Sequence, residues 1–315
     1  MSGVVKSFLT NDPFLRPPPA AVLGGIAGGQ TPSKYSQSPA LWNRFFDSLN
    51  IHGYYTAFDI PSAGRLADFM RAVFELPGFI DLTITNPYKT AAFACLSSLP
   101  WKIRLGERSR VLQSVNHLTG NPHHGELVAD CTDGLGMIRA VGKHLSPEGR
   151  TALLAGAGGA ARQIGYELVR GGADLIIVNI VQEDAAALAQ VLSPHCRPGR
   201  KARAAAWESA GAAAPRADII ISAITEAAPF GAAVIENLPS HILFADVRYG
   251  AMAEFALAVR AAGRTCIDGR RMLYGQFRCA AETYSDLEGL PAGPVAKSLD
   301  DIEAWFCGEE GRRIN

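Results

Sequence analysis

One lysine of this chain stands directly after a strand pattern, where a side chain can act on a bound molecule. Residues Asp81 to Thr85 alternate as a strand does, so Thr83 and Thr85 share one face. Pro87 cannot donate a hydrogen bond to a neighbouring strand, so the strand ends near it and Lys89 follows that end. A lysine is more often a solvated surface charge, but in this place it can exchange a proton with a bound hydroxyl group.

An acid in a similar position strengthens this interpretation. Asp133 follows Cys131 and Thr132 and stands immediately before an amphipathic helical pattern over 134–145. A general acid or base has to lie within hydrogen-bond reach of the oxygen that it serves. Lys89 and Asp133 are the candidates for this role. Because interacting groups titrate together, we assign the proton to neither residue alone.

A glycine-rich turn is the third chemical signal. Residues 151–155 predict a strand and 160–170 a helix, and the turn between them has the pattern GxGxxA. Gly156 permits the tight turn, Gly158 lets the backbone approach a pyrophosphate, and Ala161 lets helix and strand pack closely. The free N–H groups of the helix N-terminus also suit phosphates. The residues predicted to bind a dinucleotide here are Gly156, Ala157, Gly158, Gly159 and Ala160.

The end of the next strand bears on the choice between NAD and NADP. That strand ends in Asn179, which is followed by Ile180 and Val181. No acid stands there to accept from the ribose hydroxyls, and no arginine follows to pair with a 2′-phosphate. Asn179 can bond to a ribose oxygen. NAD is therefore weakly preferred over NADP as the cofactor, although Arg162 or Arg170 could compensate through a loop.

Strands that alternate with helices must position these groups. Strand patterns at 21–26, 54–58 and 80–85 alternate with helical patterns at 40–49, 63–74 and 90–99. The predicted fold class is α/β with two domains, an N-terminal α/β substrate domain with a mostly parallel sheet and a Rossmann-type dinucleotide-binding domain. We expect an extended lead-in over 1–20, a substrate-binding catalytic domain over 21–133 plus 270–315, and the dinucleotide-binding domain over 134–269.

Composition favours a small-molecule partner. The 315 residues include 30 basic and 30 acidic side chains, which argues against a nucleic-acid or membrane-surface protein. The six cysteines show no CxxC spacing, so no metal site is expected. No apolar run reaches about 18 residues without charge or turn formers, and the N-terminus lacks a signal-peptide pattern. We expect a cytoplasmic protein, monomeric or homodimeric.

Seven segments, in order, resemble the shikimate dehydrogenase family over about residues 20–300. One of them is the glycine turn. The other six, each with the family pattern that it resembles, are 35–39 (Ser-x-Ser-Pro), 83–89 (Asn-x-Thr-x-Pro-x-Lys), 114–116 (Ala-Val-Asn), 132–134 (Thr-Asp-Gly), 246–249 (Asp-x-x-Tyr) and 268–276 (Gly-x-x-Met-Leu-x-x-Gln). The resemblance implies an oxidoreductase that transfers hydride reversibly between NAD(P) and a ring hydroxyl of shikimate, in aromatic amino acid biosynthesis.

The resemblance also implies a role for individual residues. Lys89 and Asp133 would be the catalytic pair, and Ser36 and Ser38 would hold the substrate carboxylate, which short donors at a helix start can do. The further substrate contacts that it implies are Thr83, Thr85, Asn116, Tyr249 and Gln276. The residues that it implies beside the nicotinamide are Val247, Gly269 and Met272.

Departures from the family pattern leave the substrate open. Thr83 stands where the family has asparagine, and Cys131 replaces another asparagine. Losing one hydrogen bond to a ring hydroxyl costs about 1–3 kcal/mol if a buried polar group is left unpaired. The alternatives are a quinate or quinate/shikimate dehydrogenase and an aminoshikimate-type paralogue that uses NAD. A non-catalytic NAD(H)-binding sensor is the alternative from another class, and the retention of both Lys89 and Asp133 argues against it.

Overall fold

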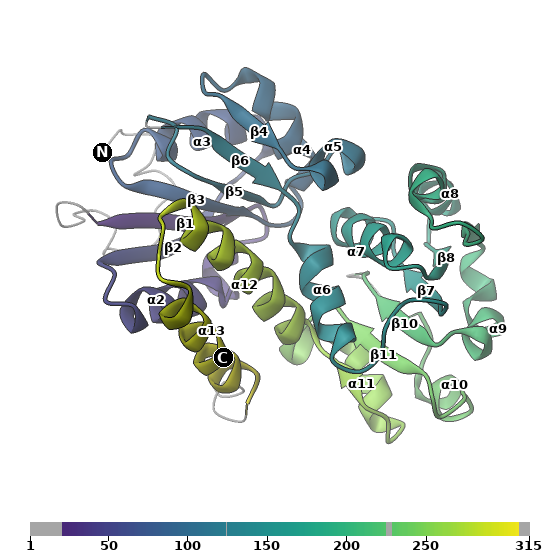
Figure 1. Cartoon of the computed structure of the whole chain (residues 1–315). Helices are drawn as coiled ribbons and strands as arrows, with labels where there is room; N and C mark the ends of the chain where they lie inside the picture. The colour runs from purple at the N-terminus through teal and green to yellow at the C-terminus, as the bar shows by residue number, and fades with distance from the viewer. Residues whose placement is uncertain (1–20, 124, 225–228, 309–315) are drawn as a thin grey trace. The chain divides into compact units, whose positions relative to one another are not determined.

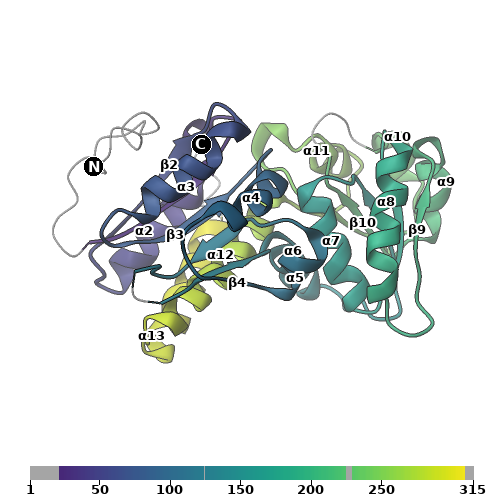
Figure 2. The ribbon, with the colours of Figure 1, turned by 90° about the horizontal axis from the view of Figure 1, so that it is seen from above.

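The computed structural model describes residues 21–123, 125–224 and 229–308, so the predicted lead-in over 1–20 lies outside the described residues. The chain divides into two compact units, Met1–Thr132 with Phe277–Asn315 (unit 1) and Asp133–Gln276 (unit 2). Figures 1 and 2 show the elements of both units from two directions. Each unit is built on its own six-stranded sheet, which confirms the predicted α/β class. No helix among the described residues is long and apolar enough to cross a membrane.

The sheet of unit 1 is mostly parallel, as predicted. Its strands are β1 (Val22–Gly28), β2 (Gly53–Asp59), β3 (Phe79–Ile84), β4 (Ile103–Leu105), β5 (His117–Thr119) and β6 (Leu127–Asp130), in the order β2-β1-β3-β5-β6-β4. Only β5 runs against its neighbours, since it pairs antiparallel with both β3 and β6. Gly24 and Gly25 make room in β1, because a Cβ atom at either position would overlap the ring of Tyr55 or Phe58.

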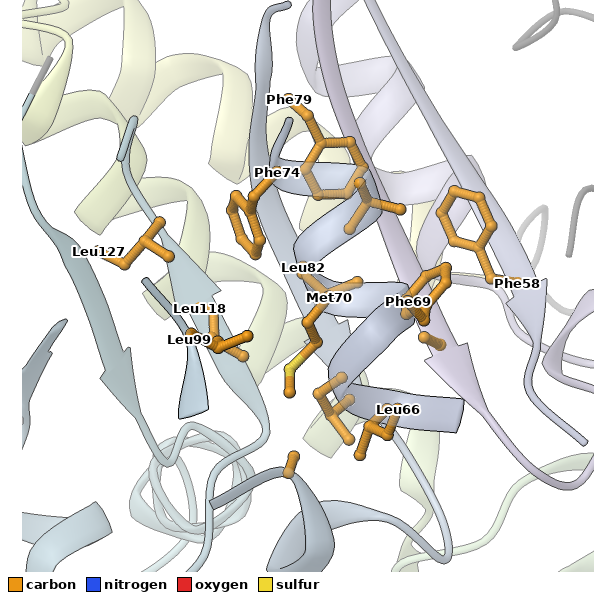
Figure 3. Packing of buried hydrophobic residues seen from close by; sticks show 14 of the residues in the cluster. Phe58, Leu66, Phe69, Met70, Phe74, Phe79, Leu82, Leu99, Leu118 and Leu127 are labelled. Atoms are coloured by element: carbon orange, nitrogen blue, oxygen red, sulfur yellow. The ribbon is translucent and has the colours of Figure 1, made fainter. Parts of the chain in front are cut away.

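Apolar side chains pack one face of this sheet against α3. The helices of unit 1 are α2 (Ser38–Ser48), α3 (Leu66–Phe74), α4 (Lys89–Cys95), α5 (Glu107–Leu112), the part of α12 (Gly269–Leu287) from Phe277 onward, and α13 (Ala292–Cys307). On α3 the buried residues are Leu66, Phe69, Met70, Val73 and Phe74, which is the spacing of one helix face. Figure 3 shows Leu66, Phe69, Met70 and Phe74 among residues of the strands. Each such burial contributes about 1.5–3 kcal/mol.

An aromatic cluster fills the other face of the sheet. Trp42 of α2 stacks on Tyr55 of β2, with ring centroids 5.2 Å apart and planes 8° apart. Phe277 and Tyr284 of α12 meet the Trp42 ring edge-on, at 5.4 and 6.1 Å. The C-terminal part of α12 therefore packs with α2 over β2, and it belongs to the core of unit 1.

Unit 2 has the predicted dinucleotide-binding topology. Its strands are β7 (Thr151–Ala155), β8 (Asp174–Val178), β9 (Ala202–Ala205), β10 (Ile219–Ser222), β11 (Leu243–Asp246) and β12 (Cys266–Ile267). All pairs are parallel, and the order β12-β11-β10-β7-β8-β9 is that of the doubly wound fold, with β7 as its first strand. The crevice at which such sheets bind ligands opens between the first and fourth strands, β7 and β10.

Helices cover both faces of the sheet of unit 2 (Figures 1 and 2). They are α6 (Asp133–Gly142), α7 (Gly159–Arg170), α8 (Gln182–Leu192), α9 (Ala210–Ala213), α10 (Ala232–Glu236) and α11 (Glu254–Ala261). The strands carry apolar side chains on both faces, as in the run 175–178 of β8, because both faces are buried. A cluster that includes Phe230, Phe244 and Phe255 packs α10 and α11 against one face of the sheet.

Candidate active site

Lys89 is the first residue of α4 and is almost withdrawn from solvent. Strand β3 ends at Ile84, and the amide of Tyr88 closes the following turn by donating to the carbonyl of Thr85 at 3.1 Å. The Tyr88 hydroxyl donates to the carbonyl of Ile60, which anchors the turn from its other side. Lys89 is 8% exposed, whereas lysine is among the residues least often buried. Lys89 is thus a fixed, buried lysine at the end of a central strand.

The loop with the two predicted carboxylate-binding serines is anchored to the same strand ends. Ser38 is the first residue of α2, and its amide donates to the hydroxyl of Ser36 at 3.3 Å. A hydrogen bond joins the side chains of Tyr35 and Thr85, and burial raises the pKa of the Tyr35 hydroxyl. Ser36, Ser38 and Thr85 therefore belong to one connected region of unit 1. Tyr35 is a further candidate residue, which the sequence pattern did not indicate.

Asp59 anchors the start of the loop that carries Ser36 and Ser38. Ser33 donates to Asp59 through its amide at 3.0 Å and through its hydroxyl at 2.6 Å. Asp59 is the last residue of β2, so the loop is tied to a strand of the sheet. The loop that follows β1 is thus held at both Ser33 and Tyr35. Because the loop is already ordered, less conformational entropy is lost when a carboxylate binds to it.

Thr83 lies inside unit 1 and is bonded to a buried tyrosine. Its hydroxyl oxygen accepts a hydrogen bond from Tyr55 at 2.8 Å, and the two residues are 7% and 3% exposed. Next to them, a hydrogen bond of 2.6 Å joins Oδ2 of Asp81 and Nε2 of His117, and both side chains are buried. Burial, and then the charge of Asp81, raise the pKa of Tyr55 well above its ordinary value. Tyr55 therefore stays a neutral donor.

Asn116 holds the residue that precedes Asp133. Its Oδ1 accepts from the amide of Thr132 at 2.7 Å, and its Nδ2 donates to the Thr132 hydroxyl at 3.0 Å. The carbonyl of Asn116 accepts from the amide of Ile84 at 2.8 Å, at the end of β3. This arrangement gives Asn116 a positioning function besides the substrate contact that the family resemblance implies.

The glycine turn of unit 2 has the geometry that a pyrophosphate requires. Gly156 has φ +119°, which disfavours other residues, and a Cβ there would meet the carbonyl of Ala223. A Cβ at Gly158 would meet no atom of the described residues within 4 Å, so the backbone at Gly158 is open to a ligand. Helix α7 starts at Gly159 without a side-chain cap, so its first N–H groups are available for an anion.

Asn179 is engaged in its own turn. Its Nδ2 donates to the carbonyl of Val181 at 3.0 Å, so only part of its amide can serve a ribose. Ile180 and Val181 are 57% and 49% exposed, and the first turn of α8 carries the acids Glu183 and Asp184. This stretch presents apolar and acidic groups at the place where the second strand of the fold ends.

The last predicted site residues lie after β11 and at the start of α12. Gly269 is required by close approach, because a Cβ there would overlap the carbonyl of Val247. Asp246 accepts from the amides of Arg248 and Ala256 at 2.9 and 3.1 Å, which fixes the segment that carries Val247 and Tyr249. Burial raises the pKa of the Asp246 carboxyl. Asp246 thus shapes this segment from within the sheet.

Asp133 begins α6, and two other helices of unit 2 hold α6 in place. The Asp133 amide donates to Oε1 of Gln163 on α7 at 3.0 Å. A Cβ at Gly136 would overlap the carbonyl of Met272 and the amide of Gln276, so α6 and α12 touch through their backbones. The structure therefore brings Asp133 to Gln163, and α6 to the stretch with Met272 and Gln276. Gln163 is a second residue that the sequence pattern did not indicate.

Each predicted site residue belongs to one of the two units. Ser36, Ser38, Thr83, Thr85, Lys89 and Asn116 belong to unit 1, and Asp133, the glycine turn, Asn179, Val247, Tyr249, Gly269, Met272 and Gln276 to unit 2. Among the described residues no group of three or more His, Cys, Asp or Glu side chains could hold a metal ion. Lys89, the carboxylate of Asp133 and the glycine turn are the candidate groups for chemistry.

A family model and curated proteins match this chain. Residues 30–105 match the model of the shikimate dehydrogenase substrate binding domain. A shikimate dehydrogenase (NADP(+)) from Xanthomonas euvesicatoria pv. vesicatoria is 33% identical over 291 residues, which are 87% of this chain and 94% of that protein. A protein of the same name from Thermococcus kodakarensis is 35% identical over 166 residues, 53% of this chain and 56% of that protein. The matched stretch thus spans about half the length of this and two further relatives.

Solved structures share the fold. The shikimate 5-dehydrogenase from Thermus thermophilus, in complex with NADP(H) and shikimate, has a TM-score of 0.67 at 25% identity and covers 89% of this chain and 99% of its own. The quinate dehydrogenase from Corynebacterium glutamicum, in complex with NAD, has a TM-score of 0.71 at 24% identity, covering 89% and 98%. At that identity the second likeness concerns the fold alone.

Proposed function

The chain belongs to the shikimate dehydrogenase family of NAD(P)-dependent oxidoreductases, and from this membership we propose that it oxidises the ring hydroxyl of shikimate reversibly to 3-dehydroshikimate. The near full-length relative and the family model over 30–105 support the proposal. We assign substrate binding to unit 1 and NAD(P) binding to unit 2. The single observation that carries the assignment is the buried Lys89 at the end of β3, because proton transfer to a ring oxygen needs such a group.

Proton transfer falls to Lys89 and Asp133. The alcohol loses a hydride to the cofactor and a proton to the protein, and Lys89 and Asp133 are the candidates for accepting that proton. Lys89 is fixed by the turn that Tyr88 closes, and Asp133 by the start of α6, so little reorganisation is needed at the moment of reaction. Bound NAD(P) supplies the hydride acceptor, and the residues of this chain supply orientation and the proton path.

Substrate orientation falls to the strand ends of unit 1. Ser36 and Ser38 at the start of α2 are assigned to the substrate carboxylate, since a helix N-terminus favours an anion. Thr85, linked to Tyr35 in the same region, is assigned as a third donor. Thr83 and Asn116 are assigned to the ring hydroxyls, with Tyr249 and Gln276 of unit 2 as the further substrate contacts. A carboxylate anchor together with ring contacts selects a cyclic hydroxy acid over a simple alcohol.

Cofactor orientation falls to the glycine turn and to the segment after β11. Residues Gly156 to Ala160 suit the pyrophosphate, as the positive φ of Gly156 and the open backbone at Gly158 support. Val247, Gly269 and Met272 are assigned to the nicotinamide. We further propose a preference for NAD over NADP. It is supported by the exposed Ile180 and Val181 and by the acids in the first turn of α8, which would repel a 2′-phosphate.

A steady-state assay that follows the absorbance of the reduced cofactor tests the proposal. Shikimate and quinate are each offered with NAD and with NADP, which gives four pairings. Turnover of shikimate with either cofactor is the expected result, with the higher kcat/KM for NAD. A protein that turns over none of the four pairings, although it binds NADH in a fluorescence titration, would contradict dehydrogenase activity and favour the sensor.

The second candidate within the family is a quinate or quinate/shikimate dehydrogenase. Thr83 and Cys131 in place of the family's asparagines favour an aminoshikimate-type paralogue instead, whereas a preference for NAD favours the quinate or quinate/shikimate dehydrogenase. A higher kcat/KM for quinate than for shikimate in the same assay would establish it, and an aminoshikimate-type substrate is added as a fifth arm. The proposed setting is the cytoplasm, with a monomer or a homodimer as the working form.

A further inference from the structure

Gln163 connects the dinucleotide-binding helix to the candidate catalytic acid. It lies on α7, one turn after the glycine-rich turn, and is 1% exposed. Its Oε1 accepts a hydrogen bond of 3.0 Å from the backbone amide of Asp133. That amide is one of the N–H groups that a helix N-terminus cannot satisfy within the helix itself. Gln163 therefore caps α6 from outside, at the residue that carries the carboxylate.

Backbone contacts make this cap a rigid link. A Cβ atom at Gly134 would overlap the carbonyl carbon and oxygen of Gln163, so α6 and α7 touch where the cap forms. The next turn of α6 is held from α12, because a Cβ at Gly275 would meet the backbone of Gly136. A substitution that displaces Gln163 would therefore also displace Asp133, because α7 and α12 pack too closely against the start of α6 for it to shift independently.

The nitrogen of the same side-chain amide suggests that a ligand binds nearby. Nε2 of Gln163 is buried and has no hydrogen-bond partner among residues 21–123, 125–224 and 229–308. A buried donor without an acceptor is costly, so a protein retains one where an acceptor arrives later. The amide that already holds Asp133 thus offers two N–H groups beside the proton-transfer residue and one helical turn from the phosphate-binding turn.

We propose that Gln163 is a positioning residue for proton transfer: its Oε1 fixes the main chain of Asp133, and its Nε2 donates to an oxygen acceptor that enters with the bound substrate or cofactor. The inference rests on the proposed dehydrogenase function and on the role of Asp133 in it. According to this inference, proton transfer needs the neutral amide of Gln163 in addition to the carboxylate of Asp133. The reacting atoms do not have to touch Gln163.

Two substitutions separate positioning from simple packing. Gln163→Met keeps the length of the side chain but removes the acceptor and the donors. Gln163→Glu keeps an acceptor oxygen, and when protonated it also keeps a donor. Gln190→Met on α8, where Gln190 is exposed, is the matched control for the same change on a helix. The measurements are kcat and KM for shikimate as a function of pH, the dissociation constant of NADH by fluorescence, and thermal unfolding.

Gln163→Met is expected to lower kcat by about 10- to 100-fold at every pH, because a displaced catalytic group loses its alignment. The dissociation constant of NADH is expected to stay unchanged if the acceptor enters with the substrate, and to rise if the acceptor enters with the cofactor. Gln163→Glu is expected to approach wild-type kcat at low pH, where the new carboxyl is neutral, and to lose activity as it ionises beside Asp133. Gln190→Met is expected to behave as the wild type in every measurement.

Other outcomes overturn the inference in distinguishable ways. If the wild type turns over shikimate while Gln163→Met keeps its kcat and pH profile, the positioning function is wrong and the proposed function stands. If Gln163→Met does not fold, the Gln163→Glu profile decides: a ratio to wild-type kcat that is constant with pH contradicts the inference. If the wild type turns over none of the substrates, the proposed function is wrong and this inference fails with it.

Discussion

The hydroxyl group of Tyr55 donates a 2.8 Å hydrogen bond to Oγ1 of Thr83 in the interior of unit 1. The tyrosine ring lies over Gly24, which has no side chain to displace it, and stacks on Trp42. A residue assigned to the substrate is thereby built into the aromatic core. Changes at Thr83 will therefore affect both the binding of the ring and the stability of unit 1, and the two effects have to be measured separately.

Tyr55→Phe should reduce the loss of stability at alkaline pH. The pKa of Tyr55 is raised in the folded protein by burial and by Asp81, so the unfolded chain releases this proton first. The free energy of unfolding therefore falls above about pH 10, by about 1.4 kcal/mol per pH unit for one such group, until the folded pKa is reached. Tyr55→Phe removes that contribution and, at neutral pH, costs about 1 kcal/mol for the lost hydrogen bond.

Denaturant unfolding of both proteins from pH 8 to pH 11 provides the measurement. Tyr284, whose pKa is also raised by burial, keeps part of the alkaline slope in the variant. Tyr54→Phe, at a partly exposed position of the same strand, is the control and should leave the slope unchanged. Equal slopes for the wild type and Tyr55→Phe would contradict the buried, neutral state of this hydroxyl.

Thr83→Asn should raise kcat/KM for shikimate relative to quinate. It restores the amide of the family pattern, and one added hydrogen bond to a ring hydroxyl is worth about 1–3 kcal/mol. Tyr55 can still donate to the new side-chain oxygen, so the fold should tolerate the change. Thr83→Val is the comparison, since it removes the acceptor for Tyr55 and adds no amide. A substrate ratio that stays the same in Thr83→Asn would place ring discrimination elsewhere.

Lys89→Met should abolish most turnover without weakening cofactor binding. Loss of a general acid or base lowers kcat by about 100- to 10,000-fold. Methionine fills the buried site without a charge, so the fold should persist. Lys102, which is 81% exposed in its ion pair with Glu126, gives the matched control Lys102→Met with unchanged kcat. Near wild-type turnover of Lys89→Met would remove Lys89 from the mechanism.

Ile180→Arg should lower the KM for NADP. An arginine at this exposed position could pair with a 2′-phosphate, and such an exposed pair is worth about 1 kcal/mol, which is about fivefold in KM. The KM for NAD should change little. Val234→Arg is the control, since Val234 is 39% exposed on α10 and belongs to none of the assigned cofactor residues. An unchanged KM for NADP would show that the end of β8 does not read the ribose.

Local patterns in the sequence were sufficient for most of the α/β elements and for the glycine turn, but they did not indicate the short elements β4, α5, β9 and α10. The spacing of Leu66, Phe69 and Val73 is the period of a helix, and the apolar run 175–178 is typical of a strand buried on both faces. Each could therefore be recognised within one segment. The positive φ of Gly156 is likewise a property that glycine tolerates by itself. Such features depend on residues that are only a few positions apart. The expected reaction was likewise predicted from short motifs, through their resemblance to the family.

Contacts between distant segments were decided only by the tertiary structure. Three hydrogen-bonded pairs, Asp81 with His117, Asn116 with Thr132, and Gln163 with Asp133, join residues 36, 16 and 30 positions apart. No periodic pattern links such pairs, because strand order and helix packing determine which side chains meet. The sequence by itself determined which residue types could do the chemistry, and the fold determined which neighbours hold Lys89, Thr83 and Asp133 in place.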